Sequence, residues 1–227
     1  MRRATAALAL VALASAGAAL APGPSRAHEA ALPPLEFEPP APGTYTLQRI
    51  MPAPDGEVLG LDGHSHRLAR FTHDRITVLG FVYTTCIDPE GCPLAQRVFD
   101  SLQRSLVETP ALRGRVRLVT LSFDPARDTP AALRAYAGHR AADERSGVAW
   151  YFFTTRSARE LTPLVEGFGQ DVRVSVDRLG GLPRRELSHV LKVFLIDRAG
   201  FVREIYSSLF LHPQTVLNDI ETLLMEQ

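Results

Sequence analysis

Cysteine is scarce in this sequence: Cys86 and Cys92 are the only two among 227 residues. A chain of this length can bury a full core in one domain without disulfide bonds, so the fold does not require a disulfide framework. The sequence also has no excess of charge, since 25 Lys and Arg residues balance 25 Asp and Glu residues. This balance gives no support for nucleic acid or an anionic membrane surface as a partner.

Long hydrophobic runs are absent after the N-terminus, so no later segment is expected to span a bilayer. Residues 1–27 have the layout of a secretory signal peptide: Arg2 and Arg3 precede an apolar run over 4–21, and small residues at 25–27 offer a cleavage site. An uncleaved membrane anchor is the alternative, but the run is Ala-rich and only weakly hydrophobic. We therefore expect the protein in a bacterial periplasm, with membrane contact only through an uncleaved N-terminal anchor.

The chain after the leader divides into a tether and one domain. Residues 28–43 are rich in proline, which favours an extended tether. Residues 44–227 are expected to form a single domain without internal repeats. At its front, residues 43–50 and 57–68 are expected to form the two strands of an N-terminal β-hairpin extension.

Strand and helix patterns alternate through the rest of the domain. Apolar segments rich in β-branched and aromatic residues predict strands over 75–84, 115–124, 148–155, 189–197 and 200–208. Amphipathic spacing and capping residues predict helices over 93–106, 129–140, 157–169 and 212–224. Pro163 is expected to shorten the third helix. This order predicts an α/β domain of three layers, with a mixed central sheet flanked by helices.

Both cysteines lie in one loop between the first buried strand and the helix that follows. Cys86 comes just past the carboxyl end of that strand, where sites in open α/β sheets usually lie. Pro93 suits the first helical position, which places Cys92 at the N-cap. The unpaired N–H groups of the helix N-terminus then favour the thiolate form of Cys92. The five intervening residues allow a metal site, a redox pair or a structural disulfide.

A metal site would need a further ligand, which one of the seven histidines could supply. His189 is the best placed, because it opens the strand predicted over 189–197. Two sulfurs and one imidazole suit copper, whereas zinc would want a fourth ligand. His64 and His66 alternate beside a turn, and His28 would become the N-terminus after cleavage. Each is a weaker candidate, because surface histidines at such positions are commonly not ligands.

Four stretches of the sequence resemble the Sco/SenC family of copper proteins, which serve cytochrome c oxidase assembly. "FVYTTC…CPLAQRVFDSLQ" resembles the family's strand, cysteine loop and helix, and "LVTLSFDPARDTPAALRAYA" resembles its next strand, turn and helix. "SHVLKVFLIDRAGFVREIY" resembles the segment that holds the family's histidine ligand, and the closing helix also fits. The resemblance covers the chain from about Tyr45 to the C-terminus. It differs at the cysteine loop, because the usual family loop has three residues between the cysteines.

The resemblance implies a thioredoxin-like fold and a copper site. It implies that Cys86, Cys92 and His189 bind one copper ion per chain, as Cu(I), Cu(II) or both. Asp124 would lie near this site and would orient a ligand or dock a partner. The partners implied are an apo-cytochrome c oxidase subunit or another cuproenzyme, together with a periplasmic thiol reductant.

Three functions follow from these observations. The resemblance favours a metallochaperone that delivers copper, most plausibly to the binuclear copper site of the oxidase, with no catalytic residue. The alternative is a thiol–disulfide reductase that keeps a partner's cysteines reduced, although the pair is not Cys-x-x-Cys and a histidine stands where thioredoxins have a cis-proline. The third is an interaction module in which a disulfide between Cys86 and Cys92 merely pins a loop.

Overall fold

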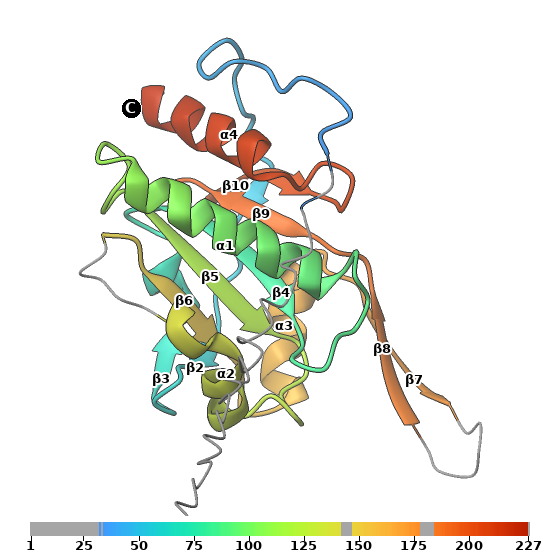
Figure 1. Cartoon of the computed structure of the whole chain (residues 1–227). Coiled ribbons are helices and arrows are strands. Elements are labelled where there is room, and N and C mark those ends of the chain that lie inside the picture. The colour runs from blue at the N-terminus through green and yellow to red at the C-terminus, as the bar shows by residue number, and fades with distance from the viewer. Residues whose placement is uncertain (1–31, 33, 142–146, 178–183, 227) are drawn as a thin grey trace, which may run out of the picture. The chain divides into compact units, whose positions relative to one another are not determined.

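The computed structural model describes residue 32 and residues 34–141, 147–177 and 184–226 (Figure 1). The signal peptide expected over 1–27 and the candidate ligand His28 lie outside the described residues. Among the residues described, none of the helices combines the length and the apolar character needed to cross a membrane.

A six-stranded mixed sheet forms the centre of the domain. In spatial order its strands are β1 (Met51–Pro52), β10 (Phe201–Tyr206), β9 (Val193–Ile196), β4 (Ile76–Val82), β5 (Val116–Ser122) and β6 (Trp150–Phe153). Strands β4, β5 and β6 are parallel, whereas β9 is antiparallel to both β4 and β10, and β1 is antiparallel to β10. Strands β4, β5 and β10 therefore end at the same edge of the sheet, and β9 begins there.

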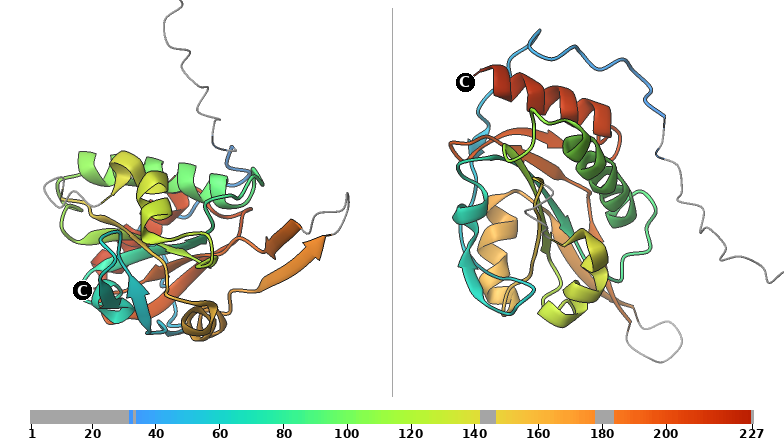
Figure 2. Two further views of the ribbon diagram at one scale, coloured as in Figure 1. Left: turned by 90° about the horizontal axis from the view of Figure 1, so that it is seen from below. Right: turned by 60° about the vertical axis from the view of Figure 1, so that its left-hand side comes forward.

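Helices cover both faces of this sheet (Figure 2). Helices α1 (Cys92–Glu108) and α4 (Pro213–Met225) lie side by side on one face, together with α2 (Pro130–Ala137). Helix α3 (Ala158–Gly167) and the short helix η1 (Leu68–Phe71) pack against the other face. The expected three-layer α/β domain with a mixed sheet is confirmed.

Burial on both faces explains the continuous apolar pattern of the central strands. Every residue of β4 is buried: Ile76 and Val78 pack in the core beneath α1, and Leu79 and Phe81 pack in the core on the α3 side. Helix α1 buries apolar side chains spaced four residues apart, namely Leu94, Val98, Leu102 and Leu106, and Leu102 is fully buried. Each such side chain stabilises the fold by roughly 1.5–3 kcal/mol relative to exposure.

Two helix boundaries differ from the sequence expectation. Gly91 is the N-cap of α1, so Cys92 is the first helical residue and Pro93 the second. Pro163 does not shorten α3, which continues to Gly167. The proline removes one backbone donor, but the buried side chains Leu161 and Leu164 on either side of it anchor both halves of the helix in the core.

The N-terminal β-hairpin forms within one of the two expected segments. It joins β2 (Glu57–Leu59) to β3 (Ser65–Arg67) through a turn at Gly63, whose φ of 81° favours glycine. The strand expected over 43–50 is absent, so that prediction was wrong. This segment is held by side chains instead: Tyr45 donates to Asp219, and Arg203 donates to the carbonyl oxygen of Leu47.

The described part of the proline-rich tether lies along α4 (Figure 1). The Asn218 side chain donates to the carbonyl oxygen of Pro40 at 2.8 Å, and the backbone N–H of Gly43 donates to Thr222 at 3.0 Å. The ring of Phe37 also contacts that of Phe210, with centroids 5.9 Å apart. Residues 37–43 are therefore attached to the domain.

A two-stranded antiparallel ribbon lies apart from the central sheet, and the sequence analysis did not predict it (Figures 1 and 2). It consists of β7 (Val172–Asp177) and β8 (Arg184–His189), with His189 paired to Val172. The strand expected from His189 onward begins only at Val193, because His189 ends the ribbon and a short link leads into β9.

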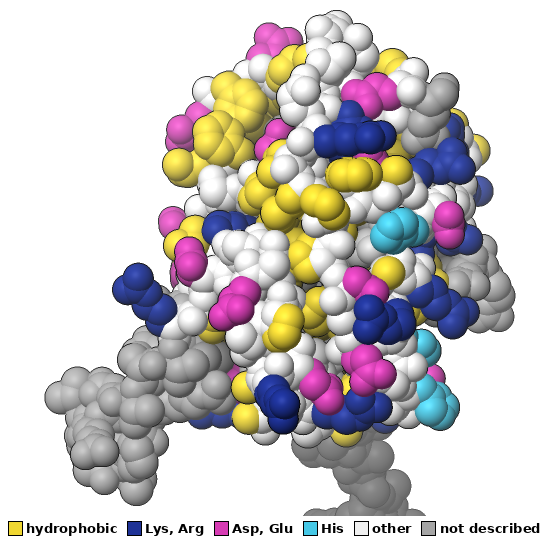
Figure 3. Space-filling model, turned by 180° about the vertical axis from the view of Figure 1, so that it is seen from behind, with side chains coloured by type: hydrophobic (Ala, Val, Ile, Leu, Met, Phe, Trp, Pro, Cys, Tyr) yellow, Lys and Arg dark blue, Asp and Glu magenta, His cyan; other side chains and the backbone are white. Residues whose placement is uncertain are grey.

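The face opposite that of Figure 1 carries charge of both signs (Figure 3). Lys and Arg side chains are interspersed with Asp and Glu side chains and with hydrophobic ones, so this face has no field of one sign.

Candidate metal centre

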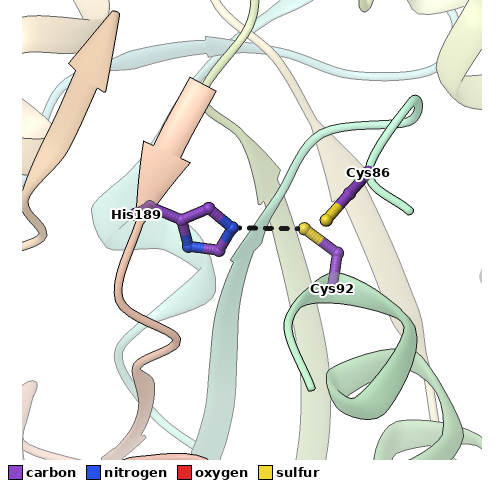
Figure 4. Close-up of side chains that lie close together, drawn as sticks. All are labelled: Cys86, Cys92 and His189. Carbon is purple, nitrogen blue, oxygen red and sulfur yellow. Dashed lines mark hydrogen bonds between the residues drawn. The ribbon is translucent and has the colours of Figure 1, made fainter. Parts of the chain in front are cut away.

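Cys86, Cys92 and His189 meet at the sheet edge where β4 ends and β9 begins (Figure 4). Their potential ligand atoms all lie within 4.8 Å of one another. The Sγ atom of Cys92 is 3.6 Å from Nε2 of His189, although the two residues are 97 positions apart in the sequence. The topology explains this convergence, because a strand that ends, a helix that begins and a strand about to enter the sheet share one edge.

The long loop between the cysteines folds into a compact turn. The side chain of Asp88 accepts a hydrogen bond from the backbone N–H of Glu90 at 3.1 Å. The backbone carbonyl oxygen of Asp88 accepts one from the backbone N–H of Gly91 at 3.0 Å. The backbone N–H of Cys86 donates to Tyr83 at 3.1 Å. The five intervening residues therefore return the chain to the start of α1 without separating the two sulfurs.

The candidate site is more open on one side than on the other. Cys92 is only 2% exposed, whereas Cys86 and His189 are half-buried. The neighbours of these two residues are exposed apolar side chains, with Ile87 at 83% and Val190 at 58%. An incoming group can therefore approach past Cys86 and His189, while Cys92 lies beneath them.

The two thiols have pKa values shifted in opposite directions. The pKa of Cys86 is lowered to about 3, chiefly by a hydrogen bond from the Cys92 thiol and further by bonds from the His189 side chain and the backbone N–H groups of Cys92 and Asp88. The pKa of Cys92 is raised, because its proton is held by the Cys86 sulfur and because the thiol is buried. The expected thiolate at Cys92 was therefore wrong, because this thiol is buried and donates its proton in a hydrogen bond to the Cys86 sulfur.

Aromatic packing holds the His189 ring in place. Its ring lies edge-on to that of Phe123 at 4.7 Å between centroids and to that of Tyr83 at 5.9 Å. Its Nδ1 atom is buried and has no hydrogen-bond partner among the described residues. The orientation that points Nε2 toward the sulfurs is therefore set by ring contacts.

Two buried carboxylates lie in the turn after β5. Asp124 is fully buried, its backbone N–H donates to Ser122 at 3.0 Å, and it is not part of the ligand group. Asp128 contacts the cysteine loop directly, because it accepts hydrogen bonds from the backbone N–H of Thr84 at 3.1 Å and from the Thr84 hydroxyl at 2.5 Å. Sequence reasoning named Asp124 and missed Asp128, which is the second aspartate of the same Asp-Pro-x-Arg-Asp motif.

Other histidines have different roles. The exposed His64 lies 2.8 Å from the Asp62 carboxylate, and the ring of His66 packs edge-on against Phe71 at 5.7 Å. His212 caps the N-terminus of α4 by accepting from Gln214. Within the described ranges, Cys86, Cys92 and His189 form the one group of three or more side chains able to hold a metal ion.

The sequence and the fold were compared with known proteins. The family model described as SCO1/SenC matches residues 53–225. The curated proteins include no significant match.

Several solved structures share the fold. ScoI from Arabidopsis thaliana, solved with copper bound, is 15% identical, with a TM-score of 0.62 over 77% of this chain and 99% of that one. A SCO1/SenC family lipoprotein from Bacillus anthracis str. Ames is 23% identical, with a TM-score of 0.60 over 77% and 95%. BsSco, a member of the Sco family of cytochrome c oxidase assembly proteins, is 19% identical, with a TM-score of 0.60 over 80% and 98%.

These likenesses confirm a single thioredoxin-like domain. The family match extends from the residue after β1 to the end of α4, and it includes all three candidate ligands. The chain belongs to the SCO1/SenC family.

Proposed function

We propose that the protein is a copper metallochaperone that holds one copper ion between Cys86, Cys92 and His189 and passes it to a cuproenzyme. The observation that carries the proposal is the convergence of two sulfur atoms and one imidazole nitrogen within 4.8 Å. Thiolate sulfur is soft enough for Cu(I), and imidazole nitrogen also accommodates Cu(II). Copper-bound structures of family members, such as ScoI from Arabidopsis thaliana, support this choice of metal.

Loading depends on the redox and protonation state of the two cysteines. Both thiols must be reduced, so a thiol reductant in the same compartment is needed. Cys86 is already a thiolate at neutral pH, whereas Cys92 holds its proton through its hydrogen bond to Cys86. Binding of copper by both sulfurs therefore releases the proton of Cys92.

The recipient that fits best is an apo-cytochrome c oxidase subunit, at its binuclear copper site. BsSco is described as belonging to a family of cytochrome c oxidase assembly proteins, which supports this class of partner. A donor atom of the recipient enters past Cys86 and replaces the ligands one at a time, with no change in the charge of the ion. The exposed Ile87 and Val190 offer apolar contacts beside this entry.

The proposed location is outside the cytoplasm. Residues 1–27 would direct export, residues 28–43 would form the tether, and residues 44–227 would form the copper-binding domain. The Bacillus anthracis relative is described as a lipoprotein, which supports a place at the outer side of a membrane. Retention of the leader would anchor the protein there.

A Cu(I) titration of the reduced domain against a competing chelator tests the proposal. We expect one tight copper ion per chain, lost in Cys86→Ser and Cys92→Ser and weakened in His189→Ala. His64→Ala is the matched control, because His64 is an exposed histidine outside the ligand group. If His189→Ala leaves both the Cu(I) affinity and the Cu(II) spectrum unchanged, the ligand assignment is wrong.

A thiol–disulfide reductase is the second candidate, favoured by the opposite pKa shifts of the two thiols. A low-pKa thiolate at the accessible Cys86, beside a protonated Cys92, resembles an attacking and a resolving thiol. BsSco is described as having a disulfide switch. A reductase would bind Cu(I) weakly and would turn over protein disulfides, whereas a metallochaperone would show tight copper binding without turnover.

A further inference from the structure

The turn after β5 contacts both halves of the candidate copper site. We name residues 122–128 the β5–α2 turn, because they connect β5 to the capped start of α2. One end of this turn reaches the cysteine loop through Asp128, and the other reaches His189 through Phe123. Tyr83, directly after β4, also contacts both sides, because its carbonyl oxygen accepts the Cys86 backbone N–H and its ring lies edge-on to His189.

At the cysteine end, Asp128 fixes the backbone that leads to Cys86. The carboxylate is 1% exposed and accepts three hydrogen bonds, from the backbone N–H and hydroxyl of Thr84 and from the hydroxyl of Ser122 at 2.5 Å. Thr84 lies two residues before Cys86. A buried carboxylate that accepts a backbone and a side-chain bond from one residue restrains both the position and the direction of the chain there.

At the histidine end, Phe123 and Tyr83 hold the imidazole ring. The centroids of these two rings lie 5.2 Å apart, and each ring lies edge-on to the ring of His189. Histidines that bind metal usually donate their other ring N–H to a carboxylate or a carbonyl, which fixes the ring. The buried Nδ1 of His189 has no such partner among the described residues, so the ring contacts replace that restraint.

Internal hydrogen bonds make the turn a rigid unit. The backbone N–H groups of Arg127 and Asp128 donate to the carbonyl oxygen of Asp124 at 3.0 and 2.8 Å. Phe123 donates its backbone N–H to Val82 of β4 at 3.0 Å, so the turn is also tied to the strand that carries the cysteine loop.

We propose that the β5–α2 turn is the positioning element of the copper site, with Asp128 as the positioning residue for Cys86 and Phe123 as the positioning residue for His189. This inference rests on the proposed copper-binding function. One rigid segment then holds ligands that are distant in sequence at a fixed separation. The two ends have separable effects, because thiolates dominate the binding of Cu(I) and the imidazole adds to the binding of Cu(II).

The test uses Asp128→Asn and Phe123→Leu, each with a matched control. Asp197→Asn removes another buried carboxylate that accepts backbone N–H groups, at the turn between β9 and β10. Phe152→Leu removes another buried ring, which stacks on Trp150. The readouts are Cu(I) affinity by chelator competition, the Cu(II) absorption and paramagnetic resonance spectra, and urea unfolding of the copper-free protein.

We expect Asp128→Asn to weaken Cu(I) binding by about 10–100-fold, as is typical when a residue that orients a ligand is lost. Phe123→Leu should change the Cu(II) spectra and leave Cu(I) affinity within about threefold of the unchanged protein. Both controls should lower stability in urea without altering either copper readout. If Asp128→Asn fails to fold, Thr84→Val removes the hydroxyl donor from the other side and should weaken Cu(I) binding in the same direction.

The proposal and the proposed function fail in different ways. Unchanged Cu(I) affinity in both Asp128→Asn and Thr84→Val, or unchanged Cu(II) spectra in Phe123→Leu, would overturn the positioning role. Equal losses of copper binding in Asp197→Asn would also overturn it, because the effect would then follow stability. If the unchanged protein binds no copper, the proposed function itself is wrong, and the positioning role falls with it.

Discussion

Cys86 should react as a thiolate across a wide range of pH. We predict that alkylation of the reduced, copper-free protein modifies Cys86 before Cys92, at a rate that is nearly constant from about pH 5 to about pH 8. The cause is the lowered pKa of Cys86, to which the hydrogen bond from Cys92 contributes most, and the burial of Cys92 beneath it.

The size of the effect follows from the thiolate fraction. An ordinary cysteine has a pKa of about 8.5, so its thiolate fraction falls by about 800-fold between pH 8 and pH 5. With a pKa of about 3, Cys86 stays almost fully ionised over the same range. The absolute rate is a poorer guide, because a thiolate of low pKa is also a weaker nucleophile. The test is therefore how steeply the alkylation rate rises with pH.

The assay is timed labelling with iodoacetamide followed by mass spectrometry. Trypsin releases residues 76–97 as one peptide with both cysteines, and fragment ions between them locate the label. Cys92→Ala is the informative variant, because it removes the hydrogen bond that contributes most and should move the rise in rate to higher pH. A rate that climbs tenfold per pH unit in the unchanged protein, or labelling of Cys92 first, would refute the reasoning.

Three further predictions concern stability and transfer. Leu102→Ala leaves a cavity beneath α1 and should cost about 2–5 kcal/mol in urea unfolding without changing the number of copper ions bound, and a cost below about 1 kcal/mol would contradict its full burial. Burial raises the pKa of Asp219 above its ordinary value of 3.8, so the stability from its proton is present below that value and is lost as the pH rises through the raised pKa. Asp219→Asn should lack this loss in unfolding curves measured at several pH values, and parallel curves would count against it. Ile87→Gln should slow copper transfer to a soluble apo-oxidase copper domain but not to a small chelator, and Ile50→Gln, at another exposed isoleucine, should slow neither.

Much of the fold could be predicted from local patterns, because those patterns report burial directly. Strand β4 is buried on both faces and reads as a continuous apolar run, and Thr129 and Pro130 mark the start of α2 as expected. The β7–β8 ribbon was missed, although valines alternate with polar residues over 172–177 and two glycines follow. The segment 43–50 has strand-like composition, but side-chain hydrogen bonds hold most of it, and backbone pairing to β10 begins only at Ile50.

The candidate site could be predicted in part, because the cysteine pair and a histidine at a strand mouth are visible in the sequence. Neither the direction of the thiol pKa shifts nor the role of Asp128 could be derived in the same way. The pKa shifts depend on the hydrogen bond between the two thiols and on the burial of Cys92, and the role of Asp128 depends on its contact with Thr84. Both are set by packing that local sequence patterns do not report. The expected influence of Asp124 on the site stays a prediction.

The ribbon of β7 and β8 has a mechanical consequence. Cys86 and Cys92 lie on the core of the domain, after a strand end and at a helix start. His189 is the last residue of the ribbon, whose two strands pair with each other. A partner that bound this ribbon would reach the imidazole without touching the two elements that carry the sulfurs. Loss of the imidazole ligand and release of copper from the sulfurs would then be separate steps, and only the second step would involve the core of the domain.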